Sequence, residues 1–405
     1  MSPPVPGDGI DDAVMGRVLV GLLEAAHQAA PGEIAGLVAD AGRAMGLSDA
    51  QVWLADVQER MLVPLPRGAG PAVDAQVPLE VDGAPAGRAY RTQRPHRTGG
   101  SASAWVPLVD GIERIGVLRV SAVVLTDDLL ERCRALASLV ALIVVSKSAY
   151  SDLLVRAVRS QPMSLQAELL WAFVPPRTIG TREATSSAIL EPAYQVAGDA
   201  FDHSLLDDVL HLTLVDAMGH DLASGGAAAI ALAASRSTRH RGGTLTDIAA
   251  IIDRTLQRWI PDLLLTAFIA DLDCITGRLS WINCAHPPPL LIRDRQVLPH
   301  ALERRPDLPL GISGHGAPQM HRVDLEPGDR ILIHTDGVTE ARSPAGELFG
   351  ERRLVDAVVR TIAAGEPAPE ALRRLVGGIL AHHAQRLRDD ATVMLVEWHP
   401  HLTQR

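Results

Sequence analysis

The sequence is poor in cysteine, and this shortage excludes several classes of protein. Its three cysteines, Cys133, Cys274 and Cys284, form no closely spaced pair, which argues against a disulfide framework and against a zinc knuckle. None of them is followed six positions later by arginine, so the nucleophilic chemistry of cysteine-based tyrosine phosphatases is unsupported.

Long apolar runs and excess positive charge are also missing. The longest apolar stretch, residues 136–145, has ten residues, whereas a membrane-spanning helix needs about 20. The first twelve residues lack the basic start and apolar core of a signal peptide. Lysine and arginine number 38 against 48 acidic residues, a net charge of −10, which argues against a general nucleic-acid footprint. We therefore expect a cytoplasmic protein that binds neither membrane nor nucleic acid.

The length of 405 residues predicts two or three domains. We expect residues 1–11 to be a disordered lead and residues 12–146 to form a compact α+β domain. Helical apolar spacing and short strand-like runs carry that prediction. The expected helices cover 12–30 and 31–45, and the expected strands 51–55, 61–64, 104–108 and 115–124.

A helical linker is predicted over residues 147–175. Its first helix begins near Thr126, a suitable N-cap, and its apolar face continues to about Gln161. A second, short helix over residues 164–173 stops before Pro175 and Pro176. Two interpretations of the long helix stay open: it packs on the first domain, or it is a signalling helix that forms a homodimer.

Residues 176–398 are predicted to form a second α+β domain. Hairpins alternate there with long helices, which favours a two-layer or sandwich fold over a purely parallel sheet. The expected strands are 193–197, 209–215, 264–272, 278–284, 330–334 and 391–398. The expected helices are 222–238, 245–259, 350–363 and 369–384.

Four aspartates of this second domain lie at predicted strand edges. Asp199, Asp216 and Asp336 end apolar runs, and Asp389 opens one. In an antiparallel sheet the end of one strand and the start of its neighbour share an edge, so the four carboxylates can converge. Two unit charges about 4 Å apart repel by about 4 kcal/mol at an effective dielectric of 20. Although a single aspartate is usually a strand-end cap, four together predict a site for divalent cations.

Carboxylates without histidine or cysteine partners suit Mg²⁺ or Mn²⁺ better than zinc. Two such ions about 3.5–4 Å apart polarise a phosphoryl oxygen and lower the pKa of a water between them. The resulting hydroxide attacks phosphorus without a protein nucleophile. Asp216 precedes the flexible Ala217-Met218-Gly219, so we expect it to bridge both ions and the Ala217 carbonyl to supply a further oxygen.

The order of these motifs resembles the PPM-type (type 2C) serine/threonine phosphatases. Within them it is similar to the branch of stage II sporulation protein E and the sigma-factor regulation phosphatases, and the resemblance covers about residues 165–398. It implies an α/β/β/α sandwich. The motifs are Gly198-Asp199, Asp216-Ala-Met-Gly-His220, Asn283-Cys-Ala-His-Pro-Pro288, Thr335-Asp-Gly-Val-Thr-Glu-Ala341 and Asp389-Asp-Ala-Thr392.

The resemblance also implies a role for each candidate residue. Asp216 would bridge two Mn²⁺ or Mg²⁺ ions, with the Ala217 carbonyl on one of them, Asp199 on the second metal and Asp336 and Asp389 on the first. The neighbouring Asp390 would act without binding metal directly. The implied substrate is phosphoserine or phosphothreonine on a regulatory protein of the anti-sigma-factor antagonist type.

Two residues depart from the family pattern. Ala200 stands where the family favours an aromatic residue, a role that Phe201 is expected to take over, and Asp221 replaces a glycine of the metal loop. An active metal-dependent phosphatase is therefore weighed against a catalytically silent PPM-like protein that titrates an anti-sigma-type partner.

The first domain resembles a GAF sensor domain through residues 86–90, 94–95 and two strand-like segments at 105–108 and 115–120. It is interpreted as a regulatory module with a small-molecule ligand, or else as a dimerisation module. A competing interpretation of the second domain uses Asp271 and Asp273, which resemble the start of a haloacid-dehalogenase phosphatase. Since Thr276-Gly277 follows at once, we expect a hairpin there. His220 and His286 are expected to be polar loop or core residues.

Overall fold

The structure is a computed structural model that describes residues 12–67, 77–100, 102–312, 316–383, 387 and 389–399. The expected lead of residues 1–11 lies outside these ranges. The chain divides into two compact units, residues 1–161 and 162–405, which are considered separately below. Within the described ranges, every helix is too short or too polar to cross a lipid bilayer.

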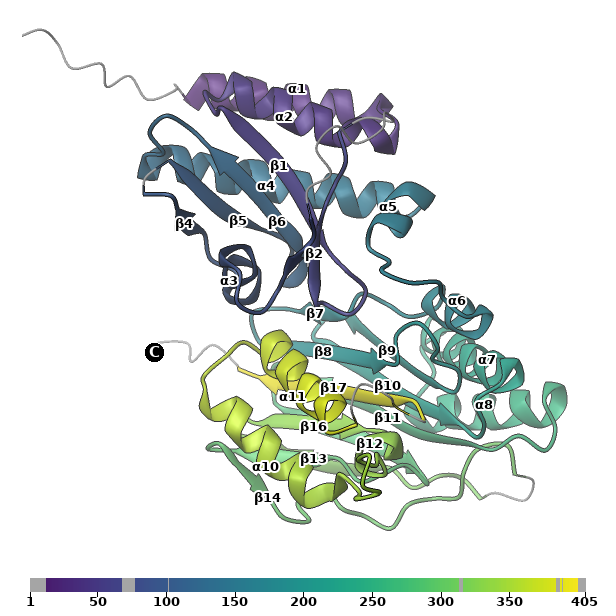
Figure 1. The fold of residues 1–405 in the computed structure, drawn as a ribbon. Helices are drawn as coiled ribbons and strands as arrows, with labels where there is room; N and C mark the ends of the chain where they lie inside the picture. Colours follow the sequence, from purple (N-terminus) through teal and green to yellow (C-terminus); the bar gives the residue numbers. More distant parts are fainter. Residues whose placement is uncertain are drawn as a thin grey trace, which may run out of the picture. The chain divides into compact units, whose positions relative to one another are not determined.

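The first unit is one antiparallel sheet with helices on both faces (Figure 1). Its strand order is β3-β2-β1-β6-β5-β4. Alternate residues of β1, β5 and β6 pack under α1, α2 and α4 in one apolar cluster, and a second cluster with Trp53, Tyr90 and Trp105 lies on the face that carries α3. The elements are α1 (Asp12–Gln28), η1 (Pro31–Glu33), α2 (Ile34–Ala44), β1 (Asp49–Ala55), β2 (Met61–Pro64), β3 (Leu79–Glu80), α3 (Pro85–Thr92), β4 (His96–Thr98), β5 (Ser103–Asp110), β6 (Glu113–Ser121), α4 (Asp127–Ser148) and α5 (Asp152–Ala157).

The single long helix predicted from Thr126 to Gln161 is wrong. Thr126 does cap α4, since its side chain accepts a hydrogen bond from the Leu129 amide at 3.1 Å, but α4 ends at Ser148. Ser151 then caps the separate helix α5 by accepting from the Leu154 amide at 3.3 Å. A serine that binds the backbone competes with helix continuation, and the continuous apolar face concealed this signal.

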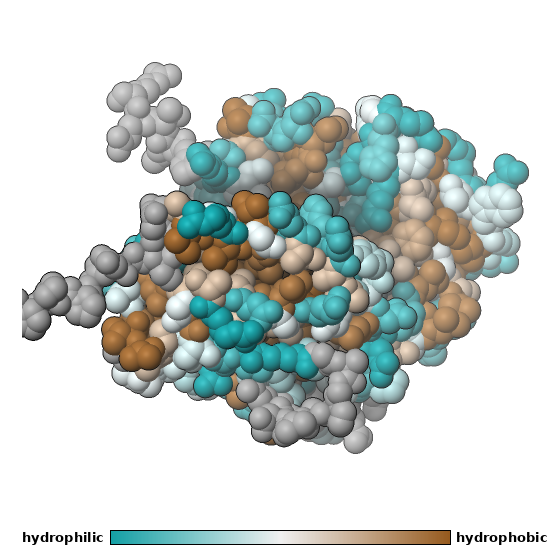
Figure 2. All heavy atoms as spheres, turned by 90° about the horizontal axis from the view of Figure 1, so that it is seen from above, coloured by the Kyte–Doolittle hydropathy of each residue, from teal (hydrophilic) through white to brown (hydrophobic). Residues whose placement is uncertain are grey.

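The surface of α4 is compatible with both interpretations of that helix, packing on the first domain and formation of a homodimer. One side is buried on the sheet, whereas Leu142 and Val145 on the other side are 55% and 38% exposed. Figure 2 shows hydrophobic and hydrophilic residues interspersed on the face that it displays. Scattered apolar side chains of this kind are normal on a protein surface, so a homodimer stays a prediction.

The second unit is a four-layer α/β/β/α sandwich. One sheet has the order β15-β12-β11-β10-β9 and the other β14-β13-β16-β17-β8-β7. Its elements are α6 (Leu165–Trp171), β7 (Thr178–Gly180), β8 (Ala184–Glu191), β9 (Asp199–Leu206), β10 (Val209–Ala217), α7 (Leu222–Arg239), α8 (Leu245–Trp259), β11 (Leu265–Asp273), β12 (Arg278–Cys284), β13 (Leu290–Arg293), β14 (Gln296–Leu298), β15 (His321–Asp324), β16 (Arg330–His334), α9 (Asp336–Thr339), α10 (Gly350–Ala363), α11 (Ala368–His382) and β17 (Ala391–Trp398).

Helices cover the outer face of each sheet (Figure 1). The α7 and α8 helices pack on β9 to β12, and α11 packs on β8 and β17. The largest apolar cluster joins α7 and α8 to the first sheet and continues into the space between the sheets, with Phe201, Phe268 and Trp281 fully buried. Strands covered on both faces bury nearly every residue, which explains the continuous apolar runs of β10 and β11.

The predicted strand over residues 193–197 is wrong, because this segment is a turn between β8 and β9. It follows Pro192, which has no amide hydrogen for a sheet ladder, and the Gln195 amide instead donates to the Pro192 carbonyl at 2.9 Å. Asp199 therefore opens β9 and does not end a strand. The aspartate still reaches the expected edge, because β9 and β10 are antiparallel and the start of one lies beside the end of the other.

Candidate active site

The two sheets bring the predicted aspartates to one edge of the sandwich. Asp199 and Asp216 are direct cross-strand partners in β9 and β10. Asp336 begins α9 just after β16, and Asp389 lies just before β17, the antiparallel neighbour of β16. Each sheet thus contributes two carboxylates, the first pair from the consecutive strands β9 and β10 and the second from residues beside β16 and β17.

These carboxylates are close enough to perturb one another. Burial and the nearby charges of Asp336, Asp389 and Asp390 raise the pKa of Asp216 to about 7. Burial and the charges of Asp216 and Asp390 raise the pKa of Asp199 well above its usual range. The pKa of Asp336 is raised by burial and by Glu340 and Asp389.

Protein cations do not neutralise this group. Within the described ranges, the ion pairs made by arginine, lysine and histidine all go to other carboxylates. Repulsion among unpaired carboxylates costs free energy in the folded protein. A divalent cation at this edge removes that cost.

Two threonines from the second sheet hold the carboxylate of Asp199. The hydroxyls of Thr335 and Thr392 each donate to its Oδ2 at 2.7 Å, and the Thr392 amide donates to the Thr335 hydroxyl at 2.9 Å. Both threonines are fully buried. Their hydroxyls favour the ionised carboxylate and point it between the sheets. Both threonines belong to the motifs found in the sequence, but the sequence did not indicate that they hold Asp199.

Asp390 anchors the backbone that precedes β9. Its Oδ2 accepts from the amides of Ala197, Gly198 and Asp199 at 2.8, 2.7 and 3.2 Å. Burial still raises the pKa of Asp390. This carboxylate therefore positions Asp199 through the chain, which agrees with the expectation that Asp390 acts from behind its neighbour Asp389.

Two glycines of the motifs are required by close backbone approach. A Cβ at Gly198 would lie 2.5 Å from the Ala217 carbonyl oxygen and 2.9 Å from that of Gly219. A Cβ at Gly337 would lie 1.8 Å from the Asp390 carbonyl oxygen. Any side chain at either position would push apart the segments that carry the aspartates.

The donor set fits a hard divalent cation. Carboxylates of Asp199, Asp216, Asp336 and Asp389, with the backbone carbonyl of Ala217 beside them, are the oxygen ligands that Mg²⁺ and Mn²⁺ prefer. In the described part of the chain, however, no three acidic, histidine or cysteine side chains already surround one point. Ion binding would therefore have to draw the carboxylates inward against their mutual repulsion.

A buried histidine contacts the strand next to Asp216. His286 Nδ1 lies 2.9 Å from the hydroxyl of Thr266, the cross-strand partner of Asp216. The Asn283 side chain clamps the turn, accepting from the His286 amide at 2.8 Å and donating to the His286 carbonyl at 2.9 Å. Burial lowers the pKa of His286 to about 3, so the imidazole is neutral. The expectation that His286 is a core residue is confirmed, whereas His220 is exposed.

One of the two departures from the family pattern, Asp221, has a structural explanation. Asp221 is the N-cap of α7, and its Oδ1 accepts from the amides of Ala223 and Ser224, both at 3.0 Å. Ala200 is fully buried opposite Val215. Phe201 is also buried but points to the other face of the strand, as neighbouring strand residues do. The expectation that Phe201 takes the place of an aromatic at position 200 is therefore wrong.

The competing pair, Asp271 and Asp273, belongs to a hairpin as expected. Asp273 Oδ1 accepts from the amides of Ile275 and Thr276 at 3.0 and 2.8 Å in the turn between β11 and β12. Asp271 Oδ1 lies 2.8 Å from His211 Nδ1. Both carboxylates thus have local structural partners.

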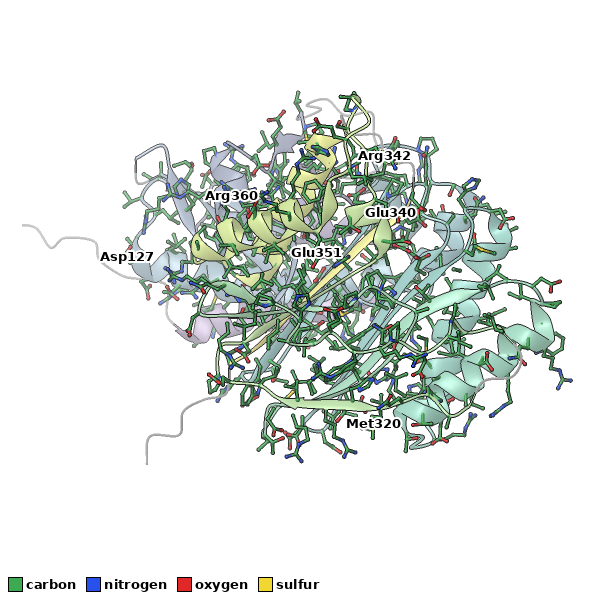
Figure 3. The ribbon with its side chains drawn as sticks, turned by 90° about the horizontal axis from the view of Figure 1, so that it is seen from below. Asp127, Met320, Glu340, Arg342, Glu351 and Arg360 are labelled. Atoms are coloured by element: carbon green, nitrogen blue, oxygen red, sulfur yellow. The ribbon has the colours of Figure 1, made fainter. Side chains whose placement is uncertain are left out.

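A small pocket beside Asp389 contains an arginine that sequence reasoning missed. Its volume is about 210 Å³, and Asp389, Glu340 and Arg342 contribute to its wall. Figure 3 shows Glu340 and Arg342 on the segment that follows α9. The Arg342 guanidinium donates to the Gly346 carbonyl at 3.2 Å and keeps further donors, which suit a phosphate oxygen. Its place directly after the motif Thr335–Ala341 was the available signal.

Comparison with known proteins identifies relatives of the second unit. The family model described as stage II sporulation protein E matches residues 207–399. Protein IcfG of Synechocystis sp. is 26% identical over 239 residues, which cover 51% of this chain and 37% of that protein. Phosphoserine phosphatase RsbU of Bacillus subtilis is 22% identical over 210 residues, which cover 52% of this chain and 62% of that protein.

Among solved structures, the RsbU and RsbW domains of Rv1364c from Mycobacterium tuberculosis align with a TM-score of 0.46 and 22% identity, over 54% of this chain and 62% of that one. The chain spans less than two thirds of the length of protein IcfG and of phosphoserine phosphatase RsbU.

Proposed function

We propose that this protein is a Mg²⁺- or Mn²⁺-dependent protein serine/threonine phosphatase of the PPM type, a proposal supported by the match of residues 207–399 to the family model described as stage II sporulation protein E. The observation that carries the proposal is the group of Asp199, Asp216, Asp336 and Asp389 at one edge, with mutually raised pKa values and no arginine or lysine partner among the described residues.

In the proposed mechanism, the chain positions the carboxylates and binds the phosphate ester. Asp216 pairs with Asp199 across the strands and its pKa is raised by Asp336 and Asp389, which supports a role for Asp216, with the Ala217 carbonyl, in holding both ions. When bound, the ions would polarise the phosphoryl oxygens and lower the pKa of a water. Thr335 and Thr392 orient Asp199 and offset part of the rise in its pKa. Arg342 would bind a phosphate oxygen next to Asp389.

The substrate that we propose is a phosphoserine or phosphothreonine on a regulatory protein of the anti-sigma-factor antagonist type. The family match and the similarity to a phosphoserine phosphatase support this class. The first unit would regulate the reaction, as its GAF-like motifs indicate, through a small ligand or a homodimer. We place the reaction in the cytoplasm.

Phosphate release from p-nitrophenyl phosphate by the full chain tests the proposal directly. We expect turnover that requires Mn²⁺ or Mg²⁺ and is abolished by Asp336→Asn, because the substitution removes a charge from the group and leaves its size unchanged. Asp208→Asn is the matched control, since Asp208 is an exposed aspartate in the turn between β9 and β10.

Each outcome separates the two candidate functions. Metal-dependent turnover lost only in Asp336→Asn supports the phosphatase. Absence of turnover at saturating Mn²⁺, in a protein that still retains a regulatory partner in a pull-down, supports the silent binding protein instead. Of the two departures that motivated that alternative, the capping role of Asp221 accounts for one, whereas the burial of Ala200 does not account for the other.

A further inference from the structure

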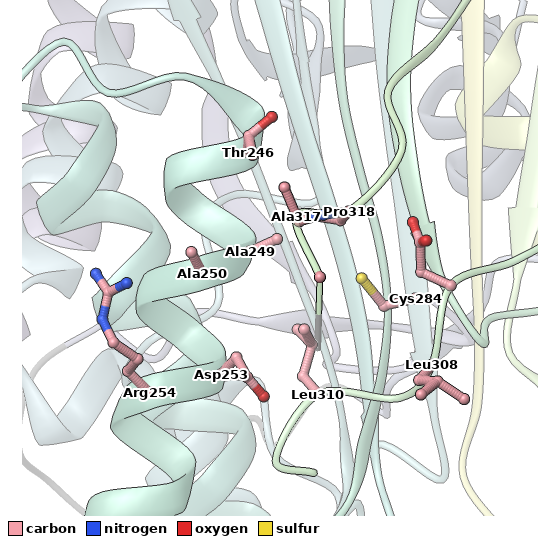
Figure 4. A pocket seen from close by; sticks show the side chains of 12 residues that line it. Thr246, Ala249, Ala250, Asp253, Arg254, Cys284, Leu308, Leu310, Ala317 and Pro318 are labelled. Atoms are coloured by element: carbon pink, nitrogen blue, oxygen red, sulfur yellow. The ribbon is translucent and has the colours of Figure 1, made fainter. Parts of the chain in front are cut away.

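A tryptophan and two arginines form an exposed patch at the end of α8. Trp259 is the last residue of the helix and is 67% exposed. The guanidinium carbon of Arg258 lies 5.1 Å from the centre of the Trp259 ring, and Arg254 lies one helical turn before Arg258. Figure 4 shows the Arg254 guanidinium on the side of α8 turned away from the pocket that Cys284 lines. These three residues, the α8 patch, therefore face solvent.

The positive charges of the α8 patch have no acidic partner in the described part of the chain. There, neither Arg254 nor Arg258 forms an ion pair. The hydroxyl and amide of Thr244 lower the pKa of Asp247 more than Arg254 does, and both donate to its Oδ2, at 2.7 and 2.9 Å. Because the whole chain has a net charge of −10, the patch is a local positive region on an acidic protein.

The α8 patch lies near the edge that carries the four aspartates. The helices α7 and α8 pack on each other and are joined by the short turn of residues 240–244 (Figure 1), so they run antiparallel. The end of α8 therefore lies beside the start of α7, which follows the loop after Asp216. Residues 260–264 lead from α8 to Leu265, the cross-strand partner of Ala217. The patch is thus a neighbour of the candidate metal site.

Two further apolar side chains are exposed on the segment after Asp216. Met218 and Leu222 are 60% and 47% exposed, and the Met218 amide donates to the Leu264 carbonyl at 2.9 Å. Aromatic residues, methionine and arginine are enriched at protein interfaces, and tryptophan and arginine often supply most of the binding energy. A protein with a phosphorylated residue at the aspartates would lie close to this surface.

We propose that the α8 patch binds an acidic segment with apolar side chains on the protein whose phosphorylated residue is hydrolysed, an inference that rests on the proposed function. Trp259 would pack on an apolar side chain, and Arg254 and Arg258 would bind carboxylates. A basic segment would be repelled, and an uncharged one would leave the arginines without a partner. Nucleic acid is a poorer partner, because the net charge of −10 repels it.

Fluorine NMR of the full chain labelled with 5-fluorotryptophan measures binding at the patch. The chain has six tryptophans, and Trp259→Phe assigns the signal of Trp259. The probe is the unphosphorylated peptide acetyl-Glu-Leu-Glu-Glu-Leu-Glu-amide. We expect it to shift the Trp259 signal and to leave the other tryptophan signals in place. The same peptide with serine for leucine should bind more weakly, and the one with lysine for glutamate should not bind.

Two arginine variants and a matched control test the contacts. Arg254→Gln and Arg258→Gln should each weaken binding of the acidic peptide by roughly two- to fivefold, the size expected for one exposed charge contact. Arg304→Gln is the control, because Arg304 is also exposed and lies 5.7 Å from a tryptophan ring, that of the fully buried Trp281; it should bind as wild type does.

Several results would overturn the proposal. They are an unmoved Trp259 signal, an equal shift with the lysine peptide, and unchanged affinity in both arginine variants. An equal loss of affinity in Arg304→Gln would also overturn it, since binding would then follow total charge. Tighter binding of the oligonucleotide (dT)8 than of the acidic peptide would assign the patch to nucleic acid instead.

Turnover of a phosphopeptide tests whether the bound segment belongs to the substrate. The acidic peptide is joined through a glycine–serine linker to a phosphoserine. We expect Arg258→Gln to raise KM for this peptide and to leave its kcat, and the turnover of p-nitrophenyl phosphate, unchanged. An unchanged KM would overturn the assignment to the substrate. Peptide binding without turnover of either compound would contradict the proposed function, and with it the identity of the partner, while the binding surface would stay supported.

Discussion

Removing the charge of Asp216 should stabilise the metal-free protein, although it destroys the proposed function. Burial and three neighbouring carboxylates raise the pKa of Asp216 from 3.8 to about 7. Above that pH the folded protein must keep a charge that its surroundings disfavour, and the unfolded chain has no such cost. Asp216→Asn keeps the size of the side chain and removes the charge.

The magnitude follows from proton linkage. A shift of about three pKa units is worth about 4 kcal/mol at 1.36 kcal/mol per unit, and partial exposure and shared charge reduce this to roughly 1–3 kcal/mol. Between the unfolded pKa of 3.8 and the folded pKa of about 7, the folded state binds the extra proton. The free energy of unfolding of the wild-type protein should therefore fall as the pH rises through this window, and level off above it.

Calorimetry in EDTA at pH 5 and pH 8 measures this effect, with the transition of the second unit identified by its upward shift in Mn²⁺. At pH 8 we expect Asp216→Asn to unfold at a higher temperature than wild type in EDTA, and to show little further shift with Mn²⁺. At pH 5 the difference between the two proteins should be only roughly a third of that at pH 8, because the loss accumulates across the whole window between the unfolded and folded pKa values. Asp208→Asn should match wild type at both pH values. A variant that is less stable than wild type at pH 8 would refute the repulsion on which the candidate site rests.

Three further substitutions test the supporting contacts. Thr392→Val removes one hydroxyl from Asp199 at nearly constant volume and should lower the free energy of unfolding in urea by about 1.5–3 kcal/mol, as expected for a hydrogen bond to a charged group; an unchanged urea midpoint would contradict the contact. His286→Ala should raise the Mn²⁺ concentration needed for half-maximal turnover. In contrast, His203→Ala, which removes a buried histidine that bridges Ser186 and the Pro176 carbonyl, should lower stability only; equal shifts in both variants would make His286 merely structural. Asp221→Ala should lower the unfolding temperature through loss of the α7 cap, and Asp221→Asn should lower it much less; thermal unfolding that ranks the two variants alike would argue against the cap.

Local patterns in the sequence were sufficient to predict many elements. The bounds of α8, α10, β12, β16 and β17 agree with the predicted ranges, because each is bordered by residues that start or stop an element and has one clear apolar period. The same local reasoning failed for the turn after Pro192 and for the break between α4 and α5. In the first case a proline without an amide hydrogen interrupts an apolar pattern that would otherwise continue, and in the second a serine side chain that caps the next helix does so.

The sequence by itself determined which residues can form the candidate site, since four carboxylates at strand edges and a specific motif order are local features. Only the tertiary structure decided how those residues are held. The hydroxyls on Asp199 come from residues 136 and 193 positions away, and Asp390 reaches backbone amides more than 190 positions away. Side-chain hydrogen bonds between sheets leave no periodic trace in a sequence, because they depend on which strands pair and in which register.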